Sequence, residues 1–162
     1  MDITKIEPGD GDVVNVFITC MKGSKDFYEY DSKTDTFILK RVLNILFPGA
    51  YGFVPKTHHI DAEPLDVLVL ISNQVQQGVV LPARPIGIIR MMGKIPDDIL
   101  IAVPISDQSL GRINDVSKLN DLEEIKSFLE AFKNLKVEFV FDTEHAKRTI
   151  KNAISLYKKE FE

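Results

Sequence analysis

The chain has 162 residues, of which 44% are hydrophobic and 27% charged, and 20 basic against 24 acidic side chains give a formal net charge of −4. This size and composition predict one globular domain over residues 1–162, and the acidic balance argues against a general nucleic-acid binder. Cys20 is the one cysteine, which excludes an internal disulfide and favours a reducing compartment. With no cationic, apolar leader and no apolar run of about 20 residues, we expect a cytoplasmic protein without a membrane partner.

Short apolar or alternating runs separated by turn residues predict strands along most of the chain. The predicted strands cover residues 13–20, 27–31, 36–42, 67–71, 79–92, 99–103 and 137–141. A hairpin turn is expected at residues 31–35, and an aromatic, glycine-bearing loop at residues 47–52. Pro82 and Pro85 predict an interruption or bulge within the run at residues 79–92, because proline cannot donate to a ladder.

Two helices are predicted in the last third of the chain. Asn120 followed by Glu123 resembles a capping box, and apolar residues then recur at helical spacing to about Leu135. A second helix is expected over residues 143–161. The fold class predicted from these elements is α+β: a closed, mostly antiparallel, five-stranded OB-like β-barrel with additional strands and two flanking helices.

An acidic stretch around Pro64 concentrates the candidate chemistry. Asp61, Glu63 and Asp66 immediately precede or begin the apolar run, so we expect them in or beside the turn that feeds a strand buried on both faces. Clustered carboxylates repel one another unless a cation lies among them, and hard oxygen ligands suit Mg²⁺ or Mn²⁺. The alternative interpretation is a solvated acidic turn, which is the commoner case for such spacing.

Five short segments spread along the chain match, in the same order, segments of a known protein family. They are GSKDFYE at 23–29, FPGAYGFV at 47–54, DAEPLDVLV at 61–69, RPIG at 84–87 and ILIAVP at 99–104. In this order they resemble the Mg²⁺-dependent, β-barrel type of soluble inorganic pyrophosphatase, over nearly the whole chain. The resemblance implies hydrolysis of inorganic pyrophosphate to two phosphates by metal-activated water, and a homo-oligomer, commonly a hexamer in prokaryotic members.

The resemblance also implies roles for individual residues. The implied metal ligands are Asp61, Glu63, Asp66 and Asp97, with Asp98 as the alternative to Asp97. The implied catalytic residues are Glu63, Asp66 and Tyr51, and the implied substrate contacts are Glu29, Arg41, Tyr51 and Lys133. The cofactor would be Mg²⁺, with Mn²⁺ as the alternative, and the partner pyrophosphate or another small phosphate ligand. His58 and His59 are expected to be solvent-facing loop residues, with a direct metal role as the less favoured interpretation.

Departures from the family pattern predict impaired activity. Phe27 and Ile99 stand where the family has lysines, Phe132 replaces a tyrosine, Met92-Gly93 a metal aspartate, Glu63 an aspartate and Thr19 an acidic residue. These changes remove or displace groups that neutralise phosphate charge or hold metal. A non-catalytic paralogue that binds a phosphate-containing ligand therefore stays open as the alternative. A barrel for single-stranded nucleic acid is disfavoured by the acidic balance.

Overall fold

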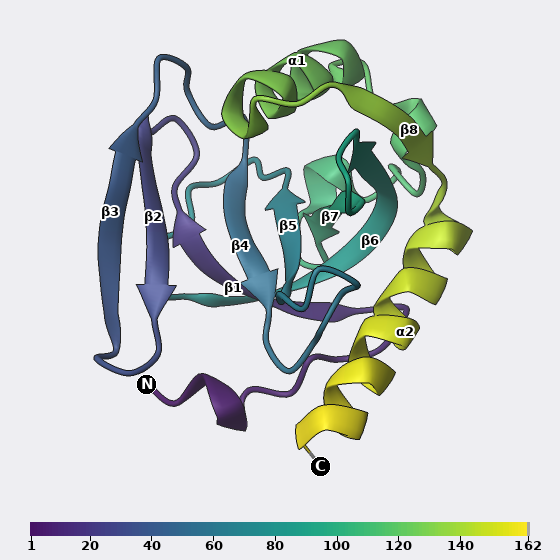
Figure 1. Cartoon of the computed structure of the whole chain (residues 1–162). Helices are drawn as coiled ribbons and strands as arrows, with labels where there is room; N and C mark the ends of the chain where they lie inside the picture. The colour runs from purple at the N-terminus through teal and green to yellow at the C-terminus, as the bar shows by residue number, and fades with distance from the viewer. Residues whose placement is uncertain (162) are drawn as a thin grey trace.

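The structure is a computed structural model that describes residues 1–161 (Figure 1). Its strands are β1 (Val14–Cys20), β2 (Asp26–Asp31), β3 (Thr36–Val42), β4 (Ala50–Val54), β5 (Leu65–Val69), β6 (Val80–Met91), β7 (Asp97–Pro104) and β8 (Val137–Phe141). Its α-helices are α1 (Leu122–Lys133) and α2 (Thr143–Phe161), and short 3-10 helices cover Ile3–Lys5, Gln108–Leu110 and Val116–Lys118.

Most strands belong to one sheet with the order β1-β4-β5-β7-β6-β8. Because β1 also pairs with β6, the strands β1, β4, β5, β7 and β6 form a ring of hydrogen-bonded neighbours. All pairings in the sheet are antiparallel except β5 with β7. The hairpin β2–β3 forms a separate sheet beside the ring, α1 crosses one end of the ring, and α2 lies along its outside (Figure 1). The predicted α+β class, with a mostly antiparallel sheet and two helices, is confirmed.

Strand β5 is buried on both faces, as its continuous apolar run predicts. Leu65, Val67 and Val69 pack in the hydrophobic cluster that includes Ala146 and Ile150 of α2. Leu68 packs in a second cluster, together with the buried face of α1. Successive side chains of a strand point to opposite faces, so Asp66 faces the same side as Leu68. The alternation thus places one carboxylate on the α1 side of the ring.

Several predicted boundaries were wrong. β5 begins at Leu65, so Asp66 lies within the strand and not in a turn. β4 takes in Ala50–Gly52 from the predicted loop, because these residues pair with β5 along its whole length. β6 is continuous, so the interruption is absent, but the predicted bulge is confirmed at Pro85, where the register with β7 shifts between Pro85 and Gly87.

The predicted capping box of α1 does not form. The helix begins at Leu122 with Asp121 as its N-cap, and no side chain caps it. Glu123 is consequently one position too early to reach back to the N-cap, and its carboxylate accepts instead from Lys126 Nζ at 3.3 Å. The helix ends at Lys133, after which Asn134 adopts the left-handed conformation with φ of 54°. Among the helices of residues 1–161, none combines the length and apolar character needed to cross a membrane.

Candidate active site

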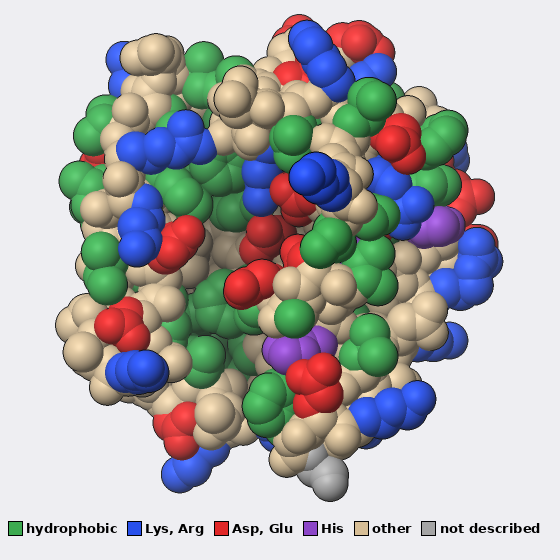
Figure 2. Space-filling view, viewed as in Figure 1, with side chains coloured by type: hydrophobic (Ala, Val, Ile, Leu, Met, Phe, Trp, Pro, Cys, Tyr) green, Lys and Arg blue, Asp and Glu red, His purple; other side chains and the backbone are tan. Residues whose placement is uncertain are grey.

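A cavity of about 510 Å³ opens between the hairpin β2–β3 and strands β4, β5 and β7. Figure 2 shows the hollow, with acidic side chains along one side and hydrophobic ones along the other. Except for Arg41, every predicted site residue lines it: Glu29, Tyr51, Asp61, Glu63, Asp66, Asp97 and Lys133. The structure therefore brings together residues from the hairpin, the ring, the acidic loop and the end of α1.

Lys133 lies between two of the carboxylates. Its Nζ is 3.4 Å from Asp66 Oδ2 and 3.3 Å from Asp97 Oδ2. Asp66 pairs with Ile99 in the parallel β5–β7 ladder, so Asp97, two residues earlier, faces the same side. The last turn of α1 brings Lys133 to that side. The Lys133 ammonium group thus neutralises part of the negative charge of Asp66 on β5 and Asp97 on β7.

The lining carries far more negative than positive charge. The carboxylates of Glu29, Asp61 and Glu63 join Asp66 and Asp97, and of the described lining residues Lys133 is the one cation. Within residues 1–161 no three His, Cys, Asp or Glu side chains converge as a ready-made metal site. One oxygen of Asp61 also accepts from the Glu63 N–H at 3.0 Å.

These residues nevertheless fit a divalent cation. All the acidic donors are hard carboxylate oxygens, which Mg²⁺ and Mn²⁺ prefer. The Lys133 ammonium, bound to Asp66 and Asp97, shows that positive charge is held at this point of the wall. Asp61 and the exposed Glu63 line the same cavity and supply further oxygen donors of this kind.

Tyr51 presents an unpaired hydroxyl at this wall. Its Oη is buried and has no hydrogen-bond partner among the described residues. Burial, together with the nearby charges of Asp66 and Asp97, raises the pKa of Tyr51 well above its ordinary value. The group therefore stays a neutral donor at physiological pH. A buried, unsatisfied donor is costly, and the neighbouring Asp66 carboxylate is the acceptor on this wall that acts on the Tyr51 hydroxyl.

Asp66 titrates close to neutrality. Burial, reinforced by the charge of Asp97, raises the pKa of Asp66 to about 6, although the Lys133 ammonium opposes the shift. Its side chain is still 36% exposed, so a ligand in the cavity can reach it. The carboxylate is consequently ionised at pH 8 and largely protonated at pH 5.

Cation affinity should follow this titration. We expect the affinity for Mn²⁺ to fall by about tenfold between about pH 7.5 and pH 5, because the cation must displace the proton that Asp66 holds at low pH. Equilibrium titration of the parent chain with Mn²⁺ across this range tests the expectation. In Asp66→Asn, which cannot titrate here, the step near pH 6 should disappear. An affinity in the parent that does not change with pH would contradict the assignment.

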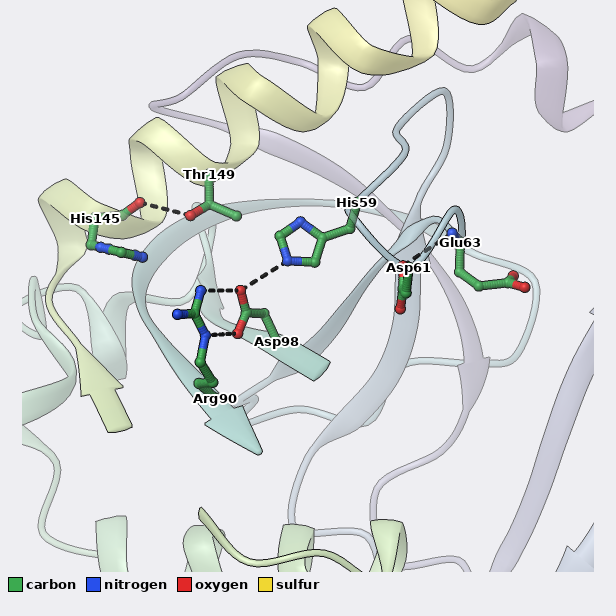
Figure 3. A network of polar contacts seen from close by, with 7 residues as sticks. All are labelled: His59, Asp61, Glu63, Arg90, Asp98, His145 and Thr149. Atoms are coloured by element: carbon green, nitrogen blue, oxygen red, sulfur yellow. Dashed lines mark hydrogen bonds and ion pairs between the residues drawn. The ribbon is translucent and has the colours of Figure 1, made fainter. Parts of the chain in front are cut away.

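Strand alternation distinguishes the two neighbouring aspartates. Asp97 lines the cavity, whereas Asp98 points to the other face of β7 and is buried. Asp98 accepts from Arg90 Nε at 2.8 Å and Nη2 at 3.0 Å, and from His59 Nε2 at 2.8 Å (Figure 3). Burial alone would raise the pKa of Asp98, but the bonds from His59 and Arg90 outweigh burial and lower it to about 2.

The prediction that His58 and His59 face solvent was wrong. Their side chains are only 17% and 12% exposed, because the acidic loop lies against α2 and β7. His58 Nδ1 is 2.8 Å from a carboxylate oxygen of Glu160 in α2.

Sequence reasoning also missed the network around Asp98. The feature that could have revealed this network is the opposite-charge pair Arg90–Asp98 on neighbouring strands, and it can be recognised only once the β6–β7 register is known.

Arg41 is the predicted substrate contact that the structure does not bring into the cavity. Its Nη2 donates to the Phe132 carbonyl at the end of α1. Its guanidinium also lies over the rings of Phe27 and Phe132, 5.7 and 5.5 Å from their centroids. Of the apolar departures from the family pattern, Phe27 lines the cavity, whereas Ile99 of β7 and Phe132 of α1 are buried in the same core cluster. The cavity therefore retains room beside these replacements.

Comparison with known proteins assigns the family. The family model described as Inorganic pyrophosphatase matches residues 16–158. The chain belongs to this family. It is 35% identical over 165 residues to the inorganic pyrophosphatase of Haloferax volcanii, covering 95% of this chain and 93% of that protein. With that of Saccharolobus solfataricus it shares 39% identity over 170 residues, covering 96% and 99%.

Solved structures of the family have the same fold. The crystal structure of the inorganic pyrophosphatase from Thermus thermophilus superposes with a TM-score of 0.89 at 34% identity, over 98% of this chain and 99% of that one. The enzyme from Helicobacter pylori gives a TM-score of 0.88 at 33% identity, over 95% and 99%. The family resemblance that the five sequence segments indicated is thus confirmed.

Proposed function

We propose that the protein hydrolyses inorganic pyrophosphate to two phosphates, with Mg²⁺ as cofactor and Mn²⁺ as the alternative. The observation that carries the proposal is the carboxylate-rich cavity around Lys133, in a chain similar over nearly its whole length to inorganic pyrophosphatases. A small, highly charged anion can enter so acidic a cavity only with cations. No comparison favours the non-catalytic alternative.

The proposed roles follow from where each side chain lies. Asp61, Glu63, Asp66 and Asp97 would hold the cation. When bound, the cation supplies neutralisation of phosphate charge and activation of the attacking water. Lys133 and the Tyr51 hydroxyl would donate to phosphate oxygens, while one of the two carboxylates, Glu63 or Asp66, would accept the single proton that the attacking water gives up. Glu29 and Arg41 would contact the substrate from the hairpin. For this, Arg41 must release its hydrogen bond to the Phe132 carbonyl and donate to a phosphate oxygen.

We also propose a single pyrophosphatase domain over residues 1–162, with the ring strands closed as a five-stranded barrel. The β1–β6 pairing and the span of the family match support these two statements. A cytoplasmic location, supported by the single, buried, free Cys20, and a hexameric assembly complete the proposal.

Phosphate release from pyrophosphate tests the function. Concentrated purified protein should release phosphate in excess Mg²⁺ and again in Mn²⁺, and a chelator should stop the release. The reduced set of charged groups at the cavity predicts a slow rate. If pyrophosphate binds saturably with no release under either cation, the binding paralogue is the better description.

A further inference from the structure

The acidic turn of residues 59–63 is closed by the backbone of His59. The His59 N–H donates to the Glu63 carbonyl at 2.9 Å, and the His59 carbonyl accepts from the Ala62 N–H at 2.9 Å. Inside the turn the Glu63 N–H donates to Asp61 Oδ1 at 3.0 Å, and Ala62 adopts a φ of 63°. The position of His59 therefore sets the position of the two carboxylates that the turn presents to the cavity.

The side chain of His59 ties this turn to β7. Its Nε2 lies 2.8 Å from Asp98 Oδ2, and Arg90 holds the same carboxylate from the neighbouring strand (Figure 3). Because an ionised carboxylate only accepts, the His59 Nε2 is the donor. The Asp98 side chain has no exposed surface, so the bond is shielded from competing water. It joins the turn to a rigid point of the ring.

Asp98 is the immediate neighbour of Asp97, which faces the cavity from the opposite side of the same strand. A shift of the turn relative to Asp98 is thus a shift of Asp61 and Glu63 relative to Asp97. The adjacent His58 has no such connection, since its ring and backbone N–H bind Glu160 and the Ala153 carbonyl of α2. The two neighbouring histidines anchor the loop to different elements.

We propose that His59 is a positioning residue for the divalent cation, because its bond to Asp98 sets the separation between the Asp61–Glu63 turn and Asp97. The inference rests on the proposed function, which takes those carboxylates as ligands of the cation. Mg²⁺ and Mn²⁺ sites need their oxygens at short, well-defined distances, and a site that is about 1 Å too loose loses its ligand. His59 acts through other residues and does not touch the cation.

Equilibrium binding of Mn²⁺, followed through the signal of free Mn²⁺ in electron paramagnetic resonance, tests this role without relying on turnover. His59→Ala should weaken Mn²⁺ binding by roughly 10–100-fold, as loss of a residue that orients metal ligands typically does. His59→Gln should restore most of the affinity, because its amide N–H can reach the place of Nε2. His58→Ala is the matched control: it removes the ring contact between the same loop and Glu160 of α2, keeps the backbone bond to Ala153, and should leave Mn²⁺ affinity at the parent level.

Unchanged Mn²⁺ affinity in folded His59→Ala would overturn the proposal, and so would an equal loss in His58→Ala. Circular dichroism establishes that each variant is folded. If His59→Ala is not, His59→Leu keeps apolar bulk without a donor and must show the same loss. A parent chain that binds Mn²⁺ but releases no phosphate overturns the proposed function alone, while the order of affinities still decides the role of His59. A parent chain that binds no Mn²⁺ overturns both.

Discussion

Replacing Asp66 with asparagine should lower pyrophosphate hydrolysis by roughly 10²–10³-fold or more, the usual scale for losing one preorganised electrostatic contact at a reacting centre. Asp66 lies among the other polar groups of the cavity wall: it is 3.4 Å from Lys133 Nζ, beside Tyr51 and on the same side as Asp97. The amide keeps the shape but removes the charge that would hold a cation and accept a proton.

The same substitution should not destabilise the protein. Because the pKa of Asp66 is raised to about 6 in the folded chain from its ordinary value of 3.8, the folded state binds a proton that the unfolded state has already lost. Stability in the absence of metal therefore falls as pH rises from about 4 to 6. At pH 8 in chelator, Asp66→Asn should consequently melt at the same temperature as the parent or higher.

Phosphate release and thermal unfolding, measured on the same preparation, test both halves of this result. Asp12→Asn is the matched control, because Asp12 is exposed, lies outside the cavity and, among the described residues, forms its one ion pair with Lys147 at 3.3 Å. It should change neither quantity. Hydrolysis by Asp66→Asn within about tenfold of the parent would remove Asp66 from the centre of the proposed chemistry.

Gly52→Ala should cost about 3 kcal/mol of unfolding free energy, the upper part of the range for overpacking. Gly52 of β4 pairs with Ile18 of β1, and a Cβ there would meet the Phe17 carbonyl oxygen at 2.0 Å and its carbon at 2.8 Å. Backbone atoms cannot swing aside as a flexible side chain can. β1 is also held by β6, and β4 by β5, so the strands cannot separate without breaking the ring.

Gly23→Ala separates this clash from loss of conformational freedom. Gly23 has a φ of 81°, but no atom lies within 4 Å of the position of its Cβ. The alanine should therefore cost only about 1 kcal/mol, through the strained backbone alone. Urea denaturation of both variants gives the comparison. Equal losses would show that the close approach of β1 and β4 relaxes easily.

Local patterns were sufficient for much of the fold. β8 and α2 have the predicted bounds: β8 is a short run rich in β-branched and aromatic residues, and α2 keeps helical spacing along its whole length. Strand starts were less predictable. Asp66 and Asp97 are acidic residues at the beginning of apolar runs, and only pairing with a neighbouring strand decides whether such residues belong to the ladder.

The site was predictable in composition but not in its connections. Segment resemblance was enough to find the predicted site residues that line the cavity, and all of them except Lys133 fall in or beside the matching stretches. To choose Asp97 over Asp98, one must know which face of β7 points into the cavity. The hydrogen bonds of His59 and Arg41 join residues that are far apart in the chain. Such pairs arise from tertiary packing and carry no signal in local spacing.

The separate hairpin β2–β3 makes the two sides of the cavity mechanically unequal. On one side the ring strands are each held by two neighbours, whereas on the other Phe27 and Glu29 stand on a two-stranded sheet that no ring strand extends. A two-stranded hairpin is marginal by itself, and regions with few partners open at the lowest free energy. The hairpin side of the cavity can therefore widen and narrow more easily than the side formed by Asp66 and Asp97, which stand on ring strands.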